Sequence, residues 1–265
     1  MKLETLLELI MEAVAENPAT SLIRKKTFQL IEELRSEGNT ELAEALERNV
    51  RIRTANPDMG TYKNYWNHLA QRLEPDEATG GGPDMHHKQY TFLVDECGLK
   101  SGEIFLDIGT GSLRGTRDII TYLEAGNFHG MDVSEALISF SQERVAASPE
   151  MSSRRPSFCV DDRFRFSSIF PDKTFDFAFA KSVFTHVYPD AIWDCLTQLR
   201  RVISPSGRFF ATIFKDNSVQ IYRGDVRKMY FNTVWLAETA NLSGWTLEEI
   251  GNTRVGQYMC LFTPN

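Results

Sequence analysis

The chain has few cysteines, and none is placed for a disulfide framework or a zinc site. Its 265 residues include four cysteines, which lie far apart without a C-x-x-C pair. This pattern indicates buried thiols of a reducing compartment, so we predict a cytoplasmic protein without a bound metal. The four residues are Cys97, Cys159, Cys195 and Cys260.

Long apolar runs and an excess of basic residues are also missing. Because no run of about 18 apolar residues occurs, we expect no membrane span. The formal net charge of −7 disfavours nucleic acid as a partner, since neutralising phosphates needs a basic face. What is present is a hydrophobic content of 42%, which is enough for a core in one large domain or in one domain with an extension.

Three amphipathic helices are predicted in the first 56 residues. Apolar residues recur at helical spacing over residues 3–16, 21–35 and 40–53, with Gly38 ending the second helix. Such short helices cannot bury their apolar faces alone, so residues 1–56 are predicted to form a helical extension. The extension either caps the main domain or docks on a partner, and the second alternative predicts a homodimer.

Residues 57–102 are predicted to form a linker and a lid. A helix over Tyr62–Leu73 carries Tyr65 and Trp66, and a glycine-rich loop at residues 80–83 separates it from a helix at residues 85–97 that carries His87. A helix between a glycine loop and the first strand either closes over a ligand or packs as an ordinary helix.

Strands and helices alternate from Ile104 onward. Regular β–α alternation predicts a mostly parallel sheet with helices on both faces, in a domain at residues 103–265. Two final strands joined by a short connection predict a hairpin, which makes the last strand antiparallel. We therefore predict an α/β, Rossmann-like fold of seven strands, at residues 104–108, 128–131, 157–160, 175–180, 208–214, 245–250 and 257–262.

A glycine turn follows the first predicted strand. Gly109 and Gly111 allow turn conformations and a close approach of the backbone to a ligand. A dinucleotide fingerprint needs a third glycine where Arg114 stands, which argues against an NAD-linked oxidoreductase. Asp107, just before the turn, suits a ligand with an amino group better than a pyrophosphate. The combination points to S-adenosylmethionine (SAM), which has an amino-acid tail and a cationic sulfur.

Acidic residues end two further strands. Asp132 follows the second strand and suits hydrogen bonds to ribose hydroxyls, while Asp161 and Asp162 follow the third, where a carboxylate can accept from an adenine amino group. Lys181 and then His186 follow the fourth strand. Because the carboxyl ends of parallel strands share one edge, these side chains are expected to converge.

These motifs resemble the class I SAM-dependent methyltransferases, over about residues 104–262. The match covers L-D-I-G-T-G, Asp132, V-D-D, F-D-F-A-F-A-K-S-V-F-T-H and V-I-S-P-S-G-R-F-F-A-T, and its details are similar to a bacterial branch that acts on small molecules. The resemblance implies SAM as cofactor. It leaves open whether Asp161 or Asp162 meets the adenine, and whether Arg114 pairs with the methionine carboxylate or lies on the surface. The cofactor-binding candidates are Asp107, Gly109, Thr110, Gly111, Ser112, Arg114, Asp132, Val133, Asp161, Asp162 and Lys181.

Methyl transfer from a sulfonium needs an aligned acceptor, and a base only where the acceptor is protonated. His186 is the candidate base, with a packing role as the alternative. Tyr65, Trp66, His87 and Tyr188 are the candidates for lining the acceptor pocket. The sequence thus predicts methyl transfer to a hydroxyl or amine of a small molecule such as a sugar or secondary metabolite. A noncatalytic protein of the same fold, binding a partner through its N-terminal helices, is the alternative.

Overall fold

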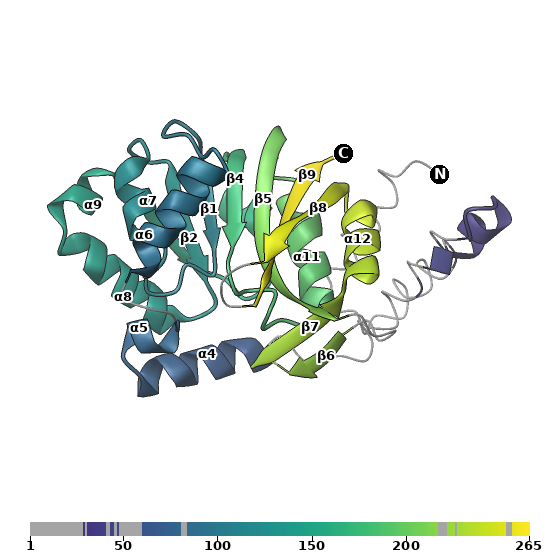
Figure 1. Cartoon of the computed structure of the whole chain (residues 1–265), viewed down its shortest axis with the longest axis horizontal. Helices are drawn as coiled ribbons and strands as arrows, with labels where there is room; N and C mark the ends of the chain where they lie inside the picture. The colour runs from purple at the N-terminus through teal and green to yellow at the C-terminus, as the bar shows by residue number, and fades with distance from the viewer. Residues whose placement is uncertain are drawn as a thin grey trace.

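The computed structural model describes residues 29, 31–40, 43, 44, 47, 60–80, 84–216, 222–225, 227–252 and 256–265. In this part of the chain, strands follow the order β3-β2-β1-β4-β5-β7-β6 in one sheet, and β9 pairs with both β5 and β8 (Figure 1). The strands are β1 (Phe105–Ile108), β2 (Phe128–Asp132), β3 (Ser157–Val160), β4 (Phe175–Ala180), β5 (Ile203–Asp216), β6 (Tyr222–Asp225), β7 (Lys228–Asn232), β8 (Trp245–Asn252) and β9 (Tyr258–Pro264).

The first five strands are parallel, whereas β9 runs antiparallel to both β5 and β8. This arrangement confirms the predicted mostly parallel sheet with an antiparallel closing strand. Helices cover it, as Figure 1 shows. They are α4 (Gly60–Arg72), α5 (Pro75–Ala78), α6 (Met85–Tyr90), the π-helix η1 (Thr91–Glu96), α7 (Arg117–Tyr122), α8 (Glu135–Ala146), α9 (Pro149–Ser153), α10 (Phe166–Ile169), α11 (Pro189–Leu199) and α12 (Thr233–Leu242).

Both faces of the central strands are buried, which explains their nearly continuous apolar sequences. Alternate residues of each strand point to opposite faces, so Phe105 and Leu106 belong to different hydrophobic clusters. One cluster includes residues of η1, α7 and α8, and within it the rings of Phe177 and Phe210 stack at 4.9 Å between centroids. The other includes residues of α11 and α12.

Along the chain, a β-hairpin of β6 and β7 lies between β5 and α12, in a region where the sequence analysis predicts no strand. Strand β7 pairs in parallel with the last residues of β5, Phe214–Asp216. The helix begins at Thr233 because Asn232 caps it, with Oδ1 accepting from the backbone N–H groups of Val234 (2.9 Å) and Trp235 (3.1 Å). Strand β7 thus extends the sheet beside the end of β5.

Little of the N-terminal extension falls within the described residues, and the predicted helix at 3–16 lies outside them. Residues 31–36 are helical, and Ile31 and Leu34 are buried. Gly38 ends this helix in a left-handed conformation (φ 82°), while the backbone N–H of Asn39 donates to the carbonyl of Leu34. No helix in the described ranges has the length and apolarity needed to cross a membrane.

Candidate functional site

The glycine turn after β1 is held tightly against β2 and the loop after β4. The backbone N–H groups of Gly109 and Thr110 both donate to the carbonyl of Met131, at 2.8 and 2.9 Å. Gly109 (φ 74°) and Gly111 (φ 56°) are left-handed. A Cβ at Gly109 would lie 2.4 Å from Cγ2 of Val183, so glycine is needed here for space as well as for conformation.

Asp107 is a buried carboxylate in front of this turn. Its Oδ2 accepts hydrogen bonds from the hydroxyls of Thr110 (2.8 Å) and Thr116 (2.6 Å). Burial, with a smaller contribution from the charge of Asp132, raises the pKa of Asp107 to about 6, although the hydrogen bonds from the two threonines act to lower it. No cationic side chain of the described residues pairs with it. Such a carboxylate is suited to a ligand that brings its own positive charge.

Asp132, at the end of β2, is fixed by the backbone on both sides. Its Oδ2 accepts from the N–H of Gly111 and its Oδ1 from the N–H of Ser134, both at 2.9 Å. Burial raises the pKa of Asp132, and these backbone donors lower it. Each carboxylate oxygen still has a lone pair, so two ligand hydroxyls can be accepted by a rigidly held group.

The two acids after β3 have different roles. The carboxylate of Asp161 accepts from the backbone N–H groups of Arg163 and Arg165, each at 3.0 Å, and from Nε of Arg165 at 2.6 Å. Its side chain is fully buried, whereas that of Asp162 is 28% exposed. Asp161 therefore holds the loop after β3, while Asp162 has the freer carboxylate.

Two adjoining clefts open at the carboxyl ends of these strands. The first, which we name the acid cleft, encloses about 870 Å³ of space open to solvent and is lined by the residues that end β2 and β3, among them Asp132, Val133, Asp161 and Asp162. The second, the lid cleft, encloses about 970 Å³ and includes Asp107, Thr110, Arg114 and residues of α6. They share Thr79, Gly109, Gly111, Lys181, Ser182 and His186.

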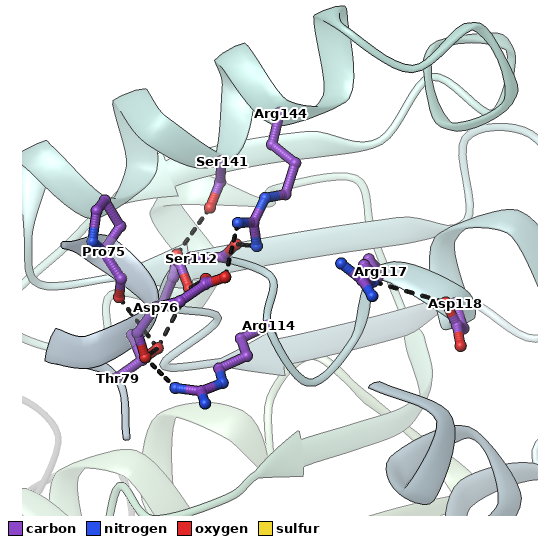
Figure 2. A network of polar contacts seen from close by, with 10 residues as sticks. Pro75, Asp76, Thr79, Ser112, Arg114, Arg117, Asp118, Ser141 and Arg144 are labelled. Carbon is purple, nitrogen blue, oxygen red and sulfur yellow. Dashed lines mark hydrogen bonds and ion pairs between the residues drawn. The ribbon is translucent and has the colours of Figure 1, made fainter. Parts of the chain in front are cut away.

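Helix α5 is bound to the glycine turn by a polar network (Figure 2). Asp76 accepts from the hydroxyl of Ser112 at 2.7 Å and pairs with Nη2 of Arg144 at 2.9 Å. Arg144 also donates to the carbonyl of Ser112 (2.7 Å), and Arg114 donates to the carbonyl of Asp76. Of the predicted cofactor-binding residues, Ser112 therefore directs its hydroxyl to α5, and Arg114 both lines the lid cleft and contacts α5.

The predicted acceptor-side residues are only partly brought together. The ring of Trp66, from α4, meets that of His186 edge-on at 5.1 Å between centroids, and both line the acid cleft. Tyr65 packs against Trp66 at 5.2 Å and does not line either cleft. His87 is exposed, and Tyr188 packs against Tyr222 at the start of α11.

Sequence patterns missed several residues of the clefts. Thr79, Met85, Gln89 and Gln257 line the lid cleft, and Phe164 lines the acid cleft. The glycine-rich loop beside Thr79 was the one available signal for the first of them. The others have ordinary sequence surroundings, and only the folded chain shows that their side chains reach the strand ends.

Comparisons with known proteins agree with this architecture. Residues 106–211 match the family model described as Methyltransferase domain. The CcbJ methyltransferase from Streptomyces caelestis has a similar structure, with 16% identity and a TM-score of 0.58, over 78% of this chain and 99% of that one. Magnesium protoporphyrin IX methyltransferase (ChlM) from Synechocystis PCC 6803, solved with bound SAM, is 14% identical with a TM-score of 0.58, over 80% of this chain and 99% of that one. The glycopeptide N-methyltransferase MtfA is 14% identical with a TM-score of 0.54, over 69% of this chain and 91% of that one.

Residues 106–211 are therefore a methyltransferase domain, and the chain has the fold of the solved SAM-dependent methyltransferases, whose cofactor is SAM.

Proposed function

We propose that the protein transfers the methyl group of SAM to a hydroxyl or amine of a small molecule, such as a sugar or secondary metabolite. The observation that carries the proposal is the meeting of the two clefts at His186 and the glycine turn. An elongated cofactor placed along both clefts has its centre beside the one histidine that lines them. The solved neighbours named for small-molecule substrates, ChlM and MtfA, support a small-molecule acceptor.

The residues of the site fit the cofactor. Gly109 and Gly111 let the turn pack closely against Val183 and Thr79, where a Cβ would collide. The acids Asp107, Asp132 and Asp162 line the clefts beside this turn. In this arrangement Asp132 accepts from the ribose hydroxyls, Asp162 from the adenine amino group, and Asp107 faces the ammonium of the tail. When bound, SAM supplies a methyl group on a cationic sulfur.

We further propose that residues 1–56 form an extension, 57–102 a linker and lid, and 103–265 the catalytic domain.

His186 is proposed as the base that takes a proton from the acceptor. Trp66 packs edge-on against its ring and so limits the orientations of the imidazole. The backbone N–H of His186 donates to the carbonyl of Val183 at 2.9 Å, which fixes the loop on the cleft wall. Trp66 and Val187 give the wall of the acid cleft an apolar surface near His186.

Titration calorimetry with SAM, S-adenosylhomocysteine (SAH) and NADH tests the proposed function. We expect binding of SAM and SAH, no tight binding of NADH, and SAH production with a panel of sugars, hydroxylated aromatics and amines. Cofactor binding without turnover on any acceptor would favour the noncatalytic alternative. The cytoplasmic location stays a prediction. A homodimer through the N-terminal helices also stays a prediction, and light scattering on the full chain tests it.

Replacing His186 by asparagine is expected to lower kcat by about 10²- to 10⁴-fold, the usual range for loss of a general base. The affinity for SAH should change less than about threefold, because the cofactor is held by the acids and the glycine turn. His68→Asn is the control, since His68 is exposed on α4 and contacts Arg72. An unchanged kcat in the His186→Asn variant would remove the proposed base.

The neighbouring acids after β3 are expected to respond in opposite ways to replacement by alanine. Asp162→Ala should weaken SAH binding about tenfold or more and change the free energy of unfolding by less than about 0.5 kcal/mol. Asp161→Ala should cost about 2–3 kcal/mol of stability, because it removes a fully buried carboxylate and leaves the N–H groups of Arg163 and Arg165 without their acceptor. Urea unfolding and SAH titration of both variants measure this. If the two variants lose the same amount of stability and the same amount of SAH affinity, the proposed division of roles between Asp161 and Asp162 is contradicted.

A further inference from the structure

Lys181 is a largely buried cation in the wall shared by the two clefts. It follows β4 directly, and its Nζ lies 3.1 Å from Sδ of Met85. With its amide oriented to satisfy both neighbours, Gln89 donates to the carbonyl of Gly115 (3.1 Å) and accepts from Nζ of Lys181 (3.0 Å). A thioether and an amide thus hold the ammonium, and no carboxylate of the described residues pairs with it.

A buried ammonium without a counter-charge is costly, which makes this arrangement unusual for a purely structural lysine. Burial, together with the positive charge of Lys88 on α6, lowers the pKa of Lys181 to about 8. The other charged or titratable groups lining the same cleft are Asp107, Arg114 and His186. Arg114 already donates to the carbonyl of Asp76, so Lys181 is the cation better able to accept a new anionic partner.

We propose that Lys181, oriented by Gln89 and Met85, binds the carboxylate of the methionine tail of SAM. This inference rests on the proposed function. The lid cleft contains both Asp107 and Lys181, which are the two opposite charges that an α-amino acid zwitterion requires. It adjoins the acid cleft, where Asp132 and Asp162 face the adenosine. The ammonium and the carboxylate of the tail are therefore bound by one side chain from the end of β1 and one from the end of β4.

The test compares SAH with 5′-methylthioadenosine, which keeps the adenosine and the sulfur but lacks the amino-acid tail. Lys181→Met is expected to weaken SAH binding about ten- to a hundredfold, the loss of one charge-assisted hydrogen bond, and to leave methylthioadenosine binding within about threefold. Lys100→Met, at an exposed lysine before β1, is the control and should bind both ligands as the wild type does.

Unchanged SAH affinity in Lys181→Met, or equal losses for both ligands, would overturn the assignment while leaving SAM binding by the wild type in place. Failure of the wild type to bind SAH would instead overturn the proposed function, and this inference with it. The melting temperature of the variant shows whether it is folded, and Lys181→Arg, which keeps the charge, should regain part of the affinity for SAH.

Proton uptake gives a second readout. A carboxylate partner raises the pKa of Lys181 in the complex above its value of about 8 in the free protein. Between these two pKa values binding takes up a proton, so SAH affinity should fall as pH rises above 8, by at most about tenfold per pH unit. The Lys181→Met variant should lack this part of the pH dependence of SAH affinity. Titration of the ligand's own amino group affects both proteins equally, so it cancels when the pH profile of the variant is subtracted from that of the wild type. Identical pH profiles would contradict the proposal.

Discussion

Asp132→Ala is expected to lose SAH binding by about 10²- to 10⁴-fold. The carboxylate is proposed to accept from two ribose hydroxyls, and a hydrogen bond to a charged group contributes about 1.5–3 kcal/mol. Removal also deprives the N–H groups of Gly111 and Ser134 of their acceptor at 2.9 Å. The substitution therefore affects both the ligand contacts and the turn that shapes the cleft.

Two further variants separate these contributions. Asp132→Asn keeps one carbonyl oxygen but no charge, so its SAH affinity should fall between those of the wild type and the alanine variant. Asp172→Ala is the control, because Asp172 is an exposed acid between α10 and β4. Calorimetric titration measures the affinities, and urea unfolding measures the stability of each variant. An SAH affinity of Asp132→Ala within threefold of the wild type would contradict the placement of the adenosine in the acid cleft.

The features predicted from the sequence are those whose cause is local. The strands around Phe105 and Phe177 have short apolar sequences with turns on either side, and Gly109 stands directly at the end of one of them. Ser134 caps α8 through the N–H of Leu137, as a serine before a helix commonly does. Residues next to strand ends share one edge of a parallel sheet whatever the rest of the chain does, so the acids could be located from the sequence.

The features that were missed depend on contacts between distant segments. Gln89 and Lys181 are far apart in the sequence, and nothing in the residues around either one indicates the hydrogen bond between them. The β6–β7 hairpin pairs with the extended end of β5, and this pairing cannot be inferred from β-propensity alone. Asp161 and Asp162 are chemically identical neighbours, so only the direction of each side chain shows which one holds the loop.

Gly109→Ala is expected to impair both folding and cofactor binding. A left-handed conformation costs an alanine about 1–2 kcal/mol, and here the new methyl group would also lie 2.4 Å from Cγ2 of Val183. Val183 or the turn must shift, and a shift that weakens two contacts to the cofactor lowers SAH affinity by about tenfold or more. Calorimetry with SAH and urea unfolding measure the two effects.

The chain offers a matched control and a rescue for this variant. Gly126 is also left-handed (φ 91°) but a Cβ there would meet nothing within 4 Å, so Gly126→Ala should lose only the conformational part of the stability and bind SAH normally. Adding Val183→Ala to Gly109→Ala removes the methyl group at 2.4 Å, and should restore SAH affinity relative to the single variant, with Val183→Ala alone as the reference. If Gly109→Ala behaves like Gly126→Ala in both measurements, close packing of the turn against Val183 does not shape the cofactor site.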